Sequence, residues 1–189
     1  MRDRPLAATR RLVYEHDLLE VYDDDLTMED GTTRRSLRLV EGTGAPGVAV
    51  VCTDGAHVLL VRQYRYAIGA DAWELPRGYG ESADPAEDAA RELHEETGIA
   101  ADSLTRLGTL HPNTGLLATE IVVFAAVVHS RALPTVSNDE VEEARWFDAE
   151  ELEEAVRTGL VTDAITLGAL LQAHVGGVLP ESATLGDGR

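Results

Sequence analysis

The segment RELHEETG, residues 91–98, decides the fold of this chain, because it completes the best-defined helical pattern in the sequence. The pattern begins after Asp84, whose side chain can cap a helix, and Pro85 suits the first helical position. Gly98 provides the residue with positive φ that commonly ends a helix. The sequence therefore predicts a helix over residues 85–97, with both of its ends well specified.

One side of this helix is apolar, and next to it lies an acidic stripe formed by Asp88, Glu92, Glu95 and Glu96. Like charges three or four residues apart each destabilise a helix by roughly 0.2–0.5 kcal/mol, and Arg91 offsets only part of this repulsion. A bound cation would relieve the rest, and carboxylate ligands suit Mg²⁺ or Mn²⁺ better than Zn²⁺. The stripe is thus a candidate metal site, although acidic helices are more often simply solvated.

Composition limits the class of protein. The 189 residues carry a formal net charge of −18, which argues against nucleic acid or an anionic membrane as the main partner. A phosphate-bearing small molecule remains compatible if a metal supplies positive charge. The sequence has no signal-peptide pattern and no apolar run long enough to span a membrane, so a cytoplasmic location is expected. The single cysteine, Cys52, lies in an apolar run and is expected in the core.

The order of the expected elements indicates an α+β fold, an α/β/α sandwich with a mixed sheet. Residues 1–10 are expected to form a loose arm, residues 23–25 an acidic spacer and residues 73–80 a loop rich in Pro and Gly. We expect an N-terminal arm with strands (1–45), a catalytic domain (46–175) and a flexible tail (176–189). Strands are predicted at 11–21, 36–40, 48–52, 57–64, 104–110, 120–128 and 144–147, and further helices at 149–158 and 163–174.

These residues resemble the Nudix hydrolase family. The family's box joins a Gly and a short loop to a helix reading Arg-Glu-hydrophobic-any-Glu-Glu-any-Gly-hydrophobic, and residues 91–99 match this helix fully. The loop departs from the pattern, because Gly78 lies thirteen residues before Arg91, one short of the usual spacing. Ala83 stands where the usual loop glutamate would fall, and Glu81 is the nearest substitute.

The flanks of the box resemble the ADP-ribose pyrophosphatase branch of that family. The Gln-any-Arg strand end of that branch corresponds here to Gln63 and Arg65. Its Glu-any-Pro-Ala-Gly loop corresponds to Glu74, Pro76 and Gly78, with Arg77 in place of the usual Ala. Its substrate loop corresponds to residues 111–120. The resemblance implies a Nudix fold with an N-terminal β-strand extension, and a homodimer whose N-terminal strands reach the partner's site. It also implies cleavage of the pyrophosphate bond of ADP-ribose or a related nucleoside diphosphate sugar, giving a nucleoside monophosphate and a sugar phosphate.

The resemblance also implies roles for individual residues at the metal site. Glu92 and Glu96 are expected to bind the metal directly, and Glu95 either joins them or orients a metal-bound water. The carbonyl of Arg77 is expected near the metal. Arg91 is expected to hold the loop and the glutamates through ion pairs.

Arg65, Glu74 and Arg77 are the candidate substrate-binding residues, since Arg suits bidentate binding of phosphate. Arg65 could equally pair with a surface carboxylate.

Glu140 is the candidate general base, in the acidic segment 137–143, with Asp139 and Glu142 in reserve; the alternative for this segment is a plain acidic surface turn. Two other functions stay open: hydrolysis of nucleoside triphosphates or dinucleotides, and a non-catalytic ligand sensor. The presence of all three box glutamates disfavours the sensor.

Overall fold

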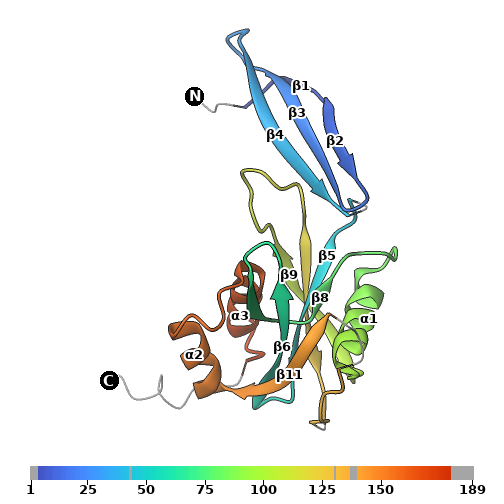
Figure 1. The fold of residues 1–189 in the computed structure, drawn as a ribbon, viewed down its shortest axis with the longest axis vertical. Helices are drawn as coiled ribbons and strands as arrows, with labels where there is room; N and C mark the ends of the chain where they lie inside the picture. The colour runs from blue at the N-terminus through green and yellow to red at the C-terminus, as the bar shows by residue number, and fades with distance from the viewer. Residues whose placement is uncertain (1–3, 43, 130, 137–139, 180–189) are drawn as a thin grey trace. The chain divides into compact units, whose positions relative to one another are not determined.

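The computed structural model describes residues 4–42, 44–129, 131–136 and 140–179, which form two compact units (Figure 1). Unit 1 contains Met1–Ala45 and His111–Glu120, and unit 2 contains Pro46–Leu110 and Ile121–Arg189. Unit 1 thus includes the segment from His111 to Glu120, which the sequence alone placed with the catalytic domain. None of the helices in the described ranges is long and apolar enough to cross a membrane.

Unit 1 is built on a four-stranded antiparallel sheet in which β3 pairs with each of the other strands. The segment from His111 to Glu120 joins this unit through a bridge between Leu39 and Leu117. The strands are β1 (Ala7–Thr9), β2 (Leu12–His16), β3 (Leu19–Thr27) and β4 (Thr33–Glu41).

Three expectations about the N-terminal region were wrong, the first being the single strand over residues 11–21, where a turn separates β2 from β3. The supposed loose arm contains β1, and the supposed acidic spacer at residues 23–25 lies inside β3. Two arginines explain why residues 23–25 form a strand: Nη2 of Arg11, the residue before β2, lies 2.9 Å from Asp23 Oδ2, and Nε of Arg38 on β4 lies 3.2 Å from Asp24 Oδ2. Cross-strand pairs of opposite charge stabilise a sheet, so carboxylates that suggested a turn are compatible with a strand.

Unit 2 is an α/β/α sandwich with a mixed sheet, as expected. Its sheet has the order β11-β6-β5-β10-β9, with β7 added to β6 and β8 added to β5. The pair β5–β10 is parallel and the other pairs are antiparallel. The strands are β5 (Gly47–Thr53), β6 (His57–Arg65), β7 (Ala70–Glu74), β8 (Arg77–Gly78), β9 (Ser103–Leu110), β10 (Ile121–Val127) and β11 (Val141–Asp148).

Helices cover both faces of this sheet. Helix α1 (Pro85–Thr97) packs on one face, while α2 (Ala149–Arg157) and α3 (Ala164–Val175) pack on the other (Figure 1). Alternation along β5 explains this arrangement, because Val50 belongs to the cluster under α1 and Val51 to the cluster under α2 and α3. The fold therefore buries two apolar layers around one central sheet.

Helix α1 has the limits that its sequence predicts. Asp84 caps it by accepting a hydrogen bond from the Ala86 backbone N–H, and Gly98 ends it with φ 68°. The expected loop at residues 73–80 is partly wrong, because Trp73 and Glu74 end β7 and residues 77–78 form β8. The reason is burial: both Trp73 and Glu74 are buried beside β6. Of the expected tail, Leu179 packs against the core, and residues 180–189 lie outside the described residues.

Candidate active site

Arg91 lies at the centre of the charged face of α1. Its guanidinium forms ion pairs with Glu92 at 3.0 Å, with Glu95 at 3.0 Å and with Asp88 at 3.4 Å. It also donates a hydrogen bond to the carbonyl of Tyr79 at 3.2 Å. One side chain therefore connects three helix carboxylates to the loop that precedes the helix.

Asp88 stabilises the shortened loop between Gly78 and α1 through hydrogen bonds to its backbone. Its carboxylate is 2% exposed and accepts hydrogen bonds from the backbone N–H groups of Glu81 at 3.2 Å and Ser82 at 3.1 Å. Burial alone would raise the pKa of Asp88, but these hydrogen bonds and the charge of Arg91 lower it below its ordinary value. Asp88 thus remains an anion that supports the loop, a role that the sequence did not reveal.

Gly78 leaves room for Glu92. A Cβ atom on Gly78 would lie 2.1 Å from the carboxyl carbon of Glu92, so any larger residue would displace that carboxylate. Gly78 is held in β8 by its pairing with Val48 of β5. Burial raises the pKa of Glu92 and the neighbouring charge of Arg91 opposes this effect. The box glycine and the box glutamate are therefore in direct contact.

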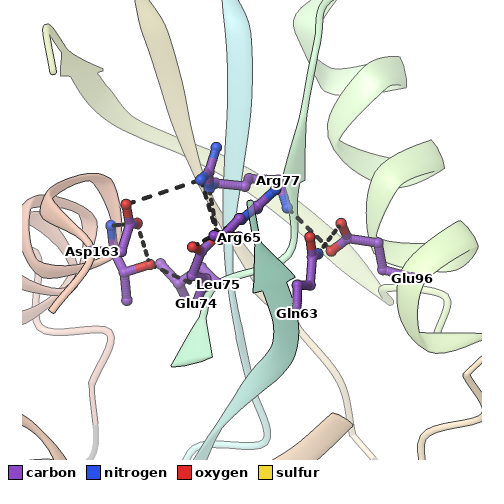
Figure 2. Close-up of polar contacts among 8 residues, drawn as sticks. Gln63, Arg65, Glu74, Leu75, Arg77, Glu96 and Asp163 are labelled. Atoms are coloured by element: carbon purple, nitrogen blue, oxygen red, sulfur yellow. Dashed lines mark hydrogen bonds and ion pairs between the residues drawn. The ribbon is translucent and has the colours of Figure 1, made fainter. Parts of the chain in front are cut away.

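Glu96 is the most deeply buried of the three box glutamates, at 4% exposed. Its Oε1 accepts a hydrogen bond from Gln63 Nε2 at 2.9 Å, and its Oε2 accepts one from the Arg77 backbone N–H at 3.3 Å (Figure 2). Burial raises the pKa of Glu96 to about 8, although the hydrogen bond from Gln63 acts in the opposite direction. Such a carboxylate would be stabilised as an anion by a nearby cation.

Arg65 and Arg77, which we term the arginine pair, share one buried carboxylate (Figure 2). Glu74 is 2% exposed, and its oxygens accept hydrogen bonds from the Nε atoms of Arg65 and of Arg77, each at 3.0 Å. The sequence left open whether Arg65 pairs with a surface carboxylate. In the structure, Arg65 pairs with the buried carboxylate of Glu74. Guanidinium groups suit the binding of phosphate oxygens, and Asp163 is a second carboxylate near Arg77.

Helix α3 supports the segment that joins Glu74 to Arg77. Asp163 caps α3, and its Oδ1 lies 4.0 Å from Arg77 Nη2. Thr166 Oγ1 donates to Asp163 Oδ2 at 2.7 Å and accepts from the Leu75 backbone N–H at 3.0 Å. The segment between β7 and β8 is therefore fixed from the α3 face of the sheet.

The predicted metal ligands fit a hard cation by their chemistry, since Glu92, Glu95 and Glu96 all offer carboxylate oxygens from one helix. Among the residues that the structure describes, no three His, Cys, Asp or Glu side chains are grouped closely enough to hold a metal ion. The reason is that the carboxylates of Glu92 and Glu95 point to Arg91, whereas Glu96 contacts Gln63.

The candidate general base lies just before β11. Glu140 is exposed, while Asp139 falls outside the described residues. Glu142 lies inside β11 and forms an ion pair with Arg62 at 2.8 Å. Of the three acidic candidates in this segment, Glu140 is the one described with an exposed side chain outside a strand.

The chain is similar to a known domain family and to several known proteins. Residues 44–165 match the model of the NUDIX domain. The chain is 29% identical over 178 residues to the CMP-5'-(N-acetyl-N-hydroxy-3-aminopropyl)phosphonate hydrolase of Streptomyces rubellomurinus, covering 92% of this chain and 84% of that protein. It is 28% identical over 156 residues to the ADP-ribose pyrophosphatase of Bacillus subtilis, covering 82% and 78%.

A solved structure extends the likeness to the fold. A crystal structure of an ADP compounds hydrolase superposes with a TM-score of 0.74 and covers 95% of this chain and 98% of that chain. The two sequences are 20% identical, so this match concerns the fold alone.

Proposed function

This chain belongs to the NUDIX domain family of hydrolases, and we propose that it cleaves the pyrophosphate bond of ADP-ribose or a related nucleoside diphosphate sugar. The products would be a nucleoside monophosphate and a sugar phosphate. One observation carries the proposal: the backbone N–H of Arg77 contacts Glu96, while its guanidinium joins Arg65 on Glu74. A single residue thus links a carboxylate suited to a metal with a guanidinium pair suited to a diphosphate.

Hydrolases of this family generally need a divalent metal ion, and we propose Mg²⁺, with Mn²⁺ as an alternative. Glu92 and Glu96 would hold it, together with the carbonyl of Arg77, and Glu95 would bind it or orient a bound water. A divalent cation there would neutralise charge on the diphosphate and assist the attack of water on one phosphorus. Arg91 would hold the Glu92 and Glu95 side chains in place relative to the loop before α1 through the ion pairs described above.

The arginine pair is proposed to bind non-bridging oxygens of the diphosphate, and Glu74 to contribute to substrate binding by holding both guanidinium groups. Glu140 is proposed to accept the proton of the attacking water, with Asp139 and Glu142 in reserve. An exposed carboxylate beside a strand end suits this role, because it can approach a bound substrate without breaking core contacts.

We further propose a cytoplasmic homodimer formed through unit 1. Its strand β2 exposes Leu12, Val13 and Tyr14, a run of apolar side chains that a second copy could cover. Light scattering coupled to size exclusion would report a mass of two chains, and a mass of one chain at micromolar concentration would refute the dimer.

The test is a panel of phosphoanhydrides incubated with the full chain and Mg²⁺ or Mn²⁺, with products separated by anion-exchange chromatography. The panel contains ADP-ribose, other nucleoside diphosphate sugars, NADH, dinucleoside polyphosphates and nucleoside triphosphates. ADP-ribose should give AMP and ribose 5-phosphate, and the Glu96→Gln variant serves as the matched inactive control. Failure to cleave any compound with either metal would overturn the enzymatic proposal.

A CMP-linked compound is the second candidate substrate. The relative that aligns with 92% of this chain is named for hydrolysis of a CMP-linked phosphonate. The same panel should therefore include CMP-linked phosphates and phosphonates. A kcat/KM for these at least tenfold above that for ADP-ribose would assign the cytidine class instead.

A further inference from the structure

Gln63 is a buried polar residue without an assigned role. It lies on β6, is 3% exposed, and its neighbours in the sheet are Ala72 on β7 and Val141 on β11. Because β6 is paired on both edges here, the backbone that carries Gln63 is held in place. Burying an amide is unfavourable unless it is hydrogen-bonded, so an apolar residue would suit a purely structural position better.

The partner of this amide is Glu96. Gln63 Nε2 donates to Glu96 Oε1 at 2.9 Å, across a separation of 33 residues in the chain. The other oxygen of Glu96 accepts from the Arg77 backbone N–H. Both donors are neutral, in contrast to the guanidinium of Arg91 that pairs with Glu92 and Glu95.

Neutral donors have a specific consequence for a metal-binding carboxylate. Each fixes the direction of one oxygen without cancelling the negative charge, and each oxygen retains a lone pair for a cation. A lysine or arginine at position 63 would neutralise the carboxylate and compete with the metal. Partners that orient a ligand in this way commonly change metal affinity 10- to 100-fold when they are removed.

We propose that Gln63 is a positioning residue that holds the Glu96 carboxylate in the orientation needed to bind the divalent cation. The inference rests on the proposed function only in taking Glu96 as a metal ligand. Gln63 itself touches neither substrate nor metal, and it acts through Glu96.

The test measures metal binding directly as well as activity. Free Mn²⁺ is followed by electron paramagnetic resonance during titration of the full chain without substrate, and Mg²⁺ activation is measured with the substrate that the panel identifies. The Gln63→Met variant keeps the side-chain length and removes the donor. We expect its Mn²⁺ dissociation constant and its Mg²⁺ activation constant to rise about tenfold or more, with KM for substrate within about twofold at saturating Mg²⁺.

Gln172 provides a matched control. It is another glutamine of unit 2 whose Nε2 donates a hydrogen bond, here to the Thr109 carbonyl at 3.0 Å, and it lies on α3 away from Glu96. The Gln172→Met variant should bind Mn²⁺ like the unmodified chain. Equal losses in both variants would show a general packing effect and overturn the proposal.

A second variant covers the case in which Gln63→Met does not fold. Gln63→Leu also lacks a side-chain donor, so its Mn²⁺ dissociation constant should rise about tenfold or more. An unchanged dissociation constant would contradict the proposal.

The Glu96→Gln variant separates failure of this inference from failure of the proposed function. Weaker Mn²⁺ binding in Glu96→Gln together with normal binding in Gln63→Met would refute the role of Gln63 alone. Normal binding in both variants would refute the metal assignment of Glu96, and the role of Gln63 with it.

Discussion

Gly78 and Glu92 are in contact: a Cβ atom on Gly78 would lie 2.1 Å from the carboxyl carbon of Glu92. Gly78 does not have a positive φ, so its backbone conformation can accept alanine. The glycine is therefore required by the space that Glu92 occupies, and its replacement should act through that carboxylate.

The Gly78→Ala variant should lower kcat/KM by roughly 10- to 100-fold, because the displaced Glu92 would bind the metal poorly. Its melting temperature should change by less than about 3 °C, since only the flexible end of a side chain has to move. Glu92→Gln alone and the double variant complete a mutant cycle. The double variant should be no worse than Glu92→Gln, and additive losses would mean that Gly78 acts elsewhere.

The Glu96→Gln variant should lose turnover and gain stability in the metal-free protein at high pH. Burial raises the pKa of Glu96 from 4.5 to about 8, so the folded protein binds this proton more tightly than the unfolded chain does. Stability of the unmodified protein therefore falls as pH rises from about 4.5 to about 8, and the variant lacks this loss. With EDTA, the variant should melt roughly 5 °C higher at pH 9 and at an equal temperature near pH 4.5. A lower melting temperature of the variant at pH 9 would contradict the assignment.

The Arg77→Ala variant should raise KM for the diphosphate substrate about tenfold, with a smaller change in kcat. The reason is that one of the two guanidinium groups held by Glu74 would be missing. Steady-state kinetics at saturating Mg²⁺ provides the measurement. Arg157→Ala is the control, because Arg157 also pairs with a glutamate, Glu154, but lies on α2. A normal KM for Arg77→Ala would exclude the guanidinium from substrate binding.

The Asp88→Ala variant should reduce the free energy of unfolding by about 1–3 kcal/mol at pH 7, because the N–H groups of Glu81 and Ser82 lose their acceptor. The pKa of Asp88 is depressed in the folded state, so its stabilisation is present above the unfolded value of 3.8 and is lost as pH falls through the folded one. Denaturant unfolding should show the difference shrinking toward pH 2. The exposed neighbour Glu87 supplies the control, and Glu87→Ala should reduce the free energy of unfolding by less than about 1 kcal/mol.

The Glu140→Gln variant should lower kcat about 100-fold or more while leaving Mn²⁺ binding unchanged, because loss of a general base affects proton transfer rather than the metal. Glu150→Gln, an exposed glutamate on α2, is the control. Glu142→Gln tests the reserve candidate that pairs with Arg62. A near-normal kcat for Glu140→Gln would eliminate Glu140 as the base.

Several features of the chain follow from the sequence because they depend on residues close together. The limits of α1 are set by Asp84, Pro85 and Gly98, which act on backbone groups within one helical turn. The buried strands β5 and β10 are visible as short apolar runs. Local patterns thus predicted α1, most strands of unit 2 and the family resemblance.

Tertiary structure decided the parts that depend on distant residues. The strand identity of Asp23 and Asp24 required arginines from β4 and from the residue before β2, and the hydrogen bond from Gln63 to Glu96 joins β6 to α1. Sequence identified Glu74, Arg65 and Arg77 as separate candidates, whereas folding placed both guanidinium groups on one buried carboxylate. The physical reason is that helix caps form between neighbours in the chain, while buried polar groups find their partners only when packing brings distant strands and helices together.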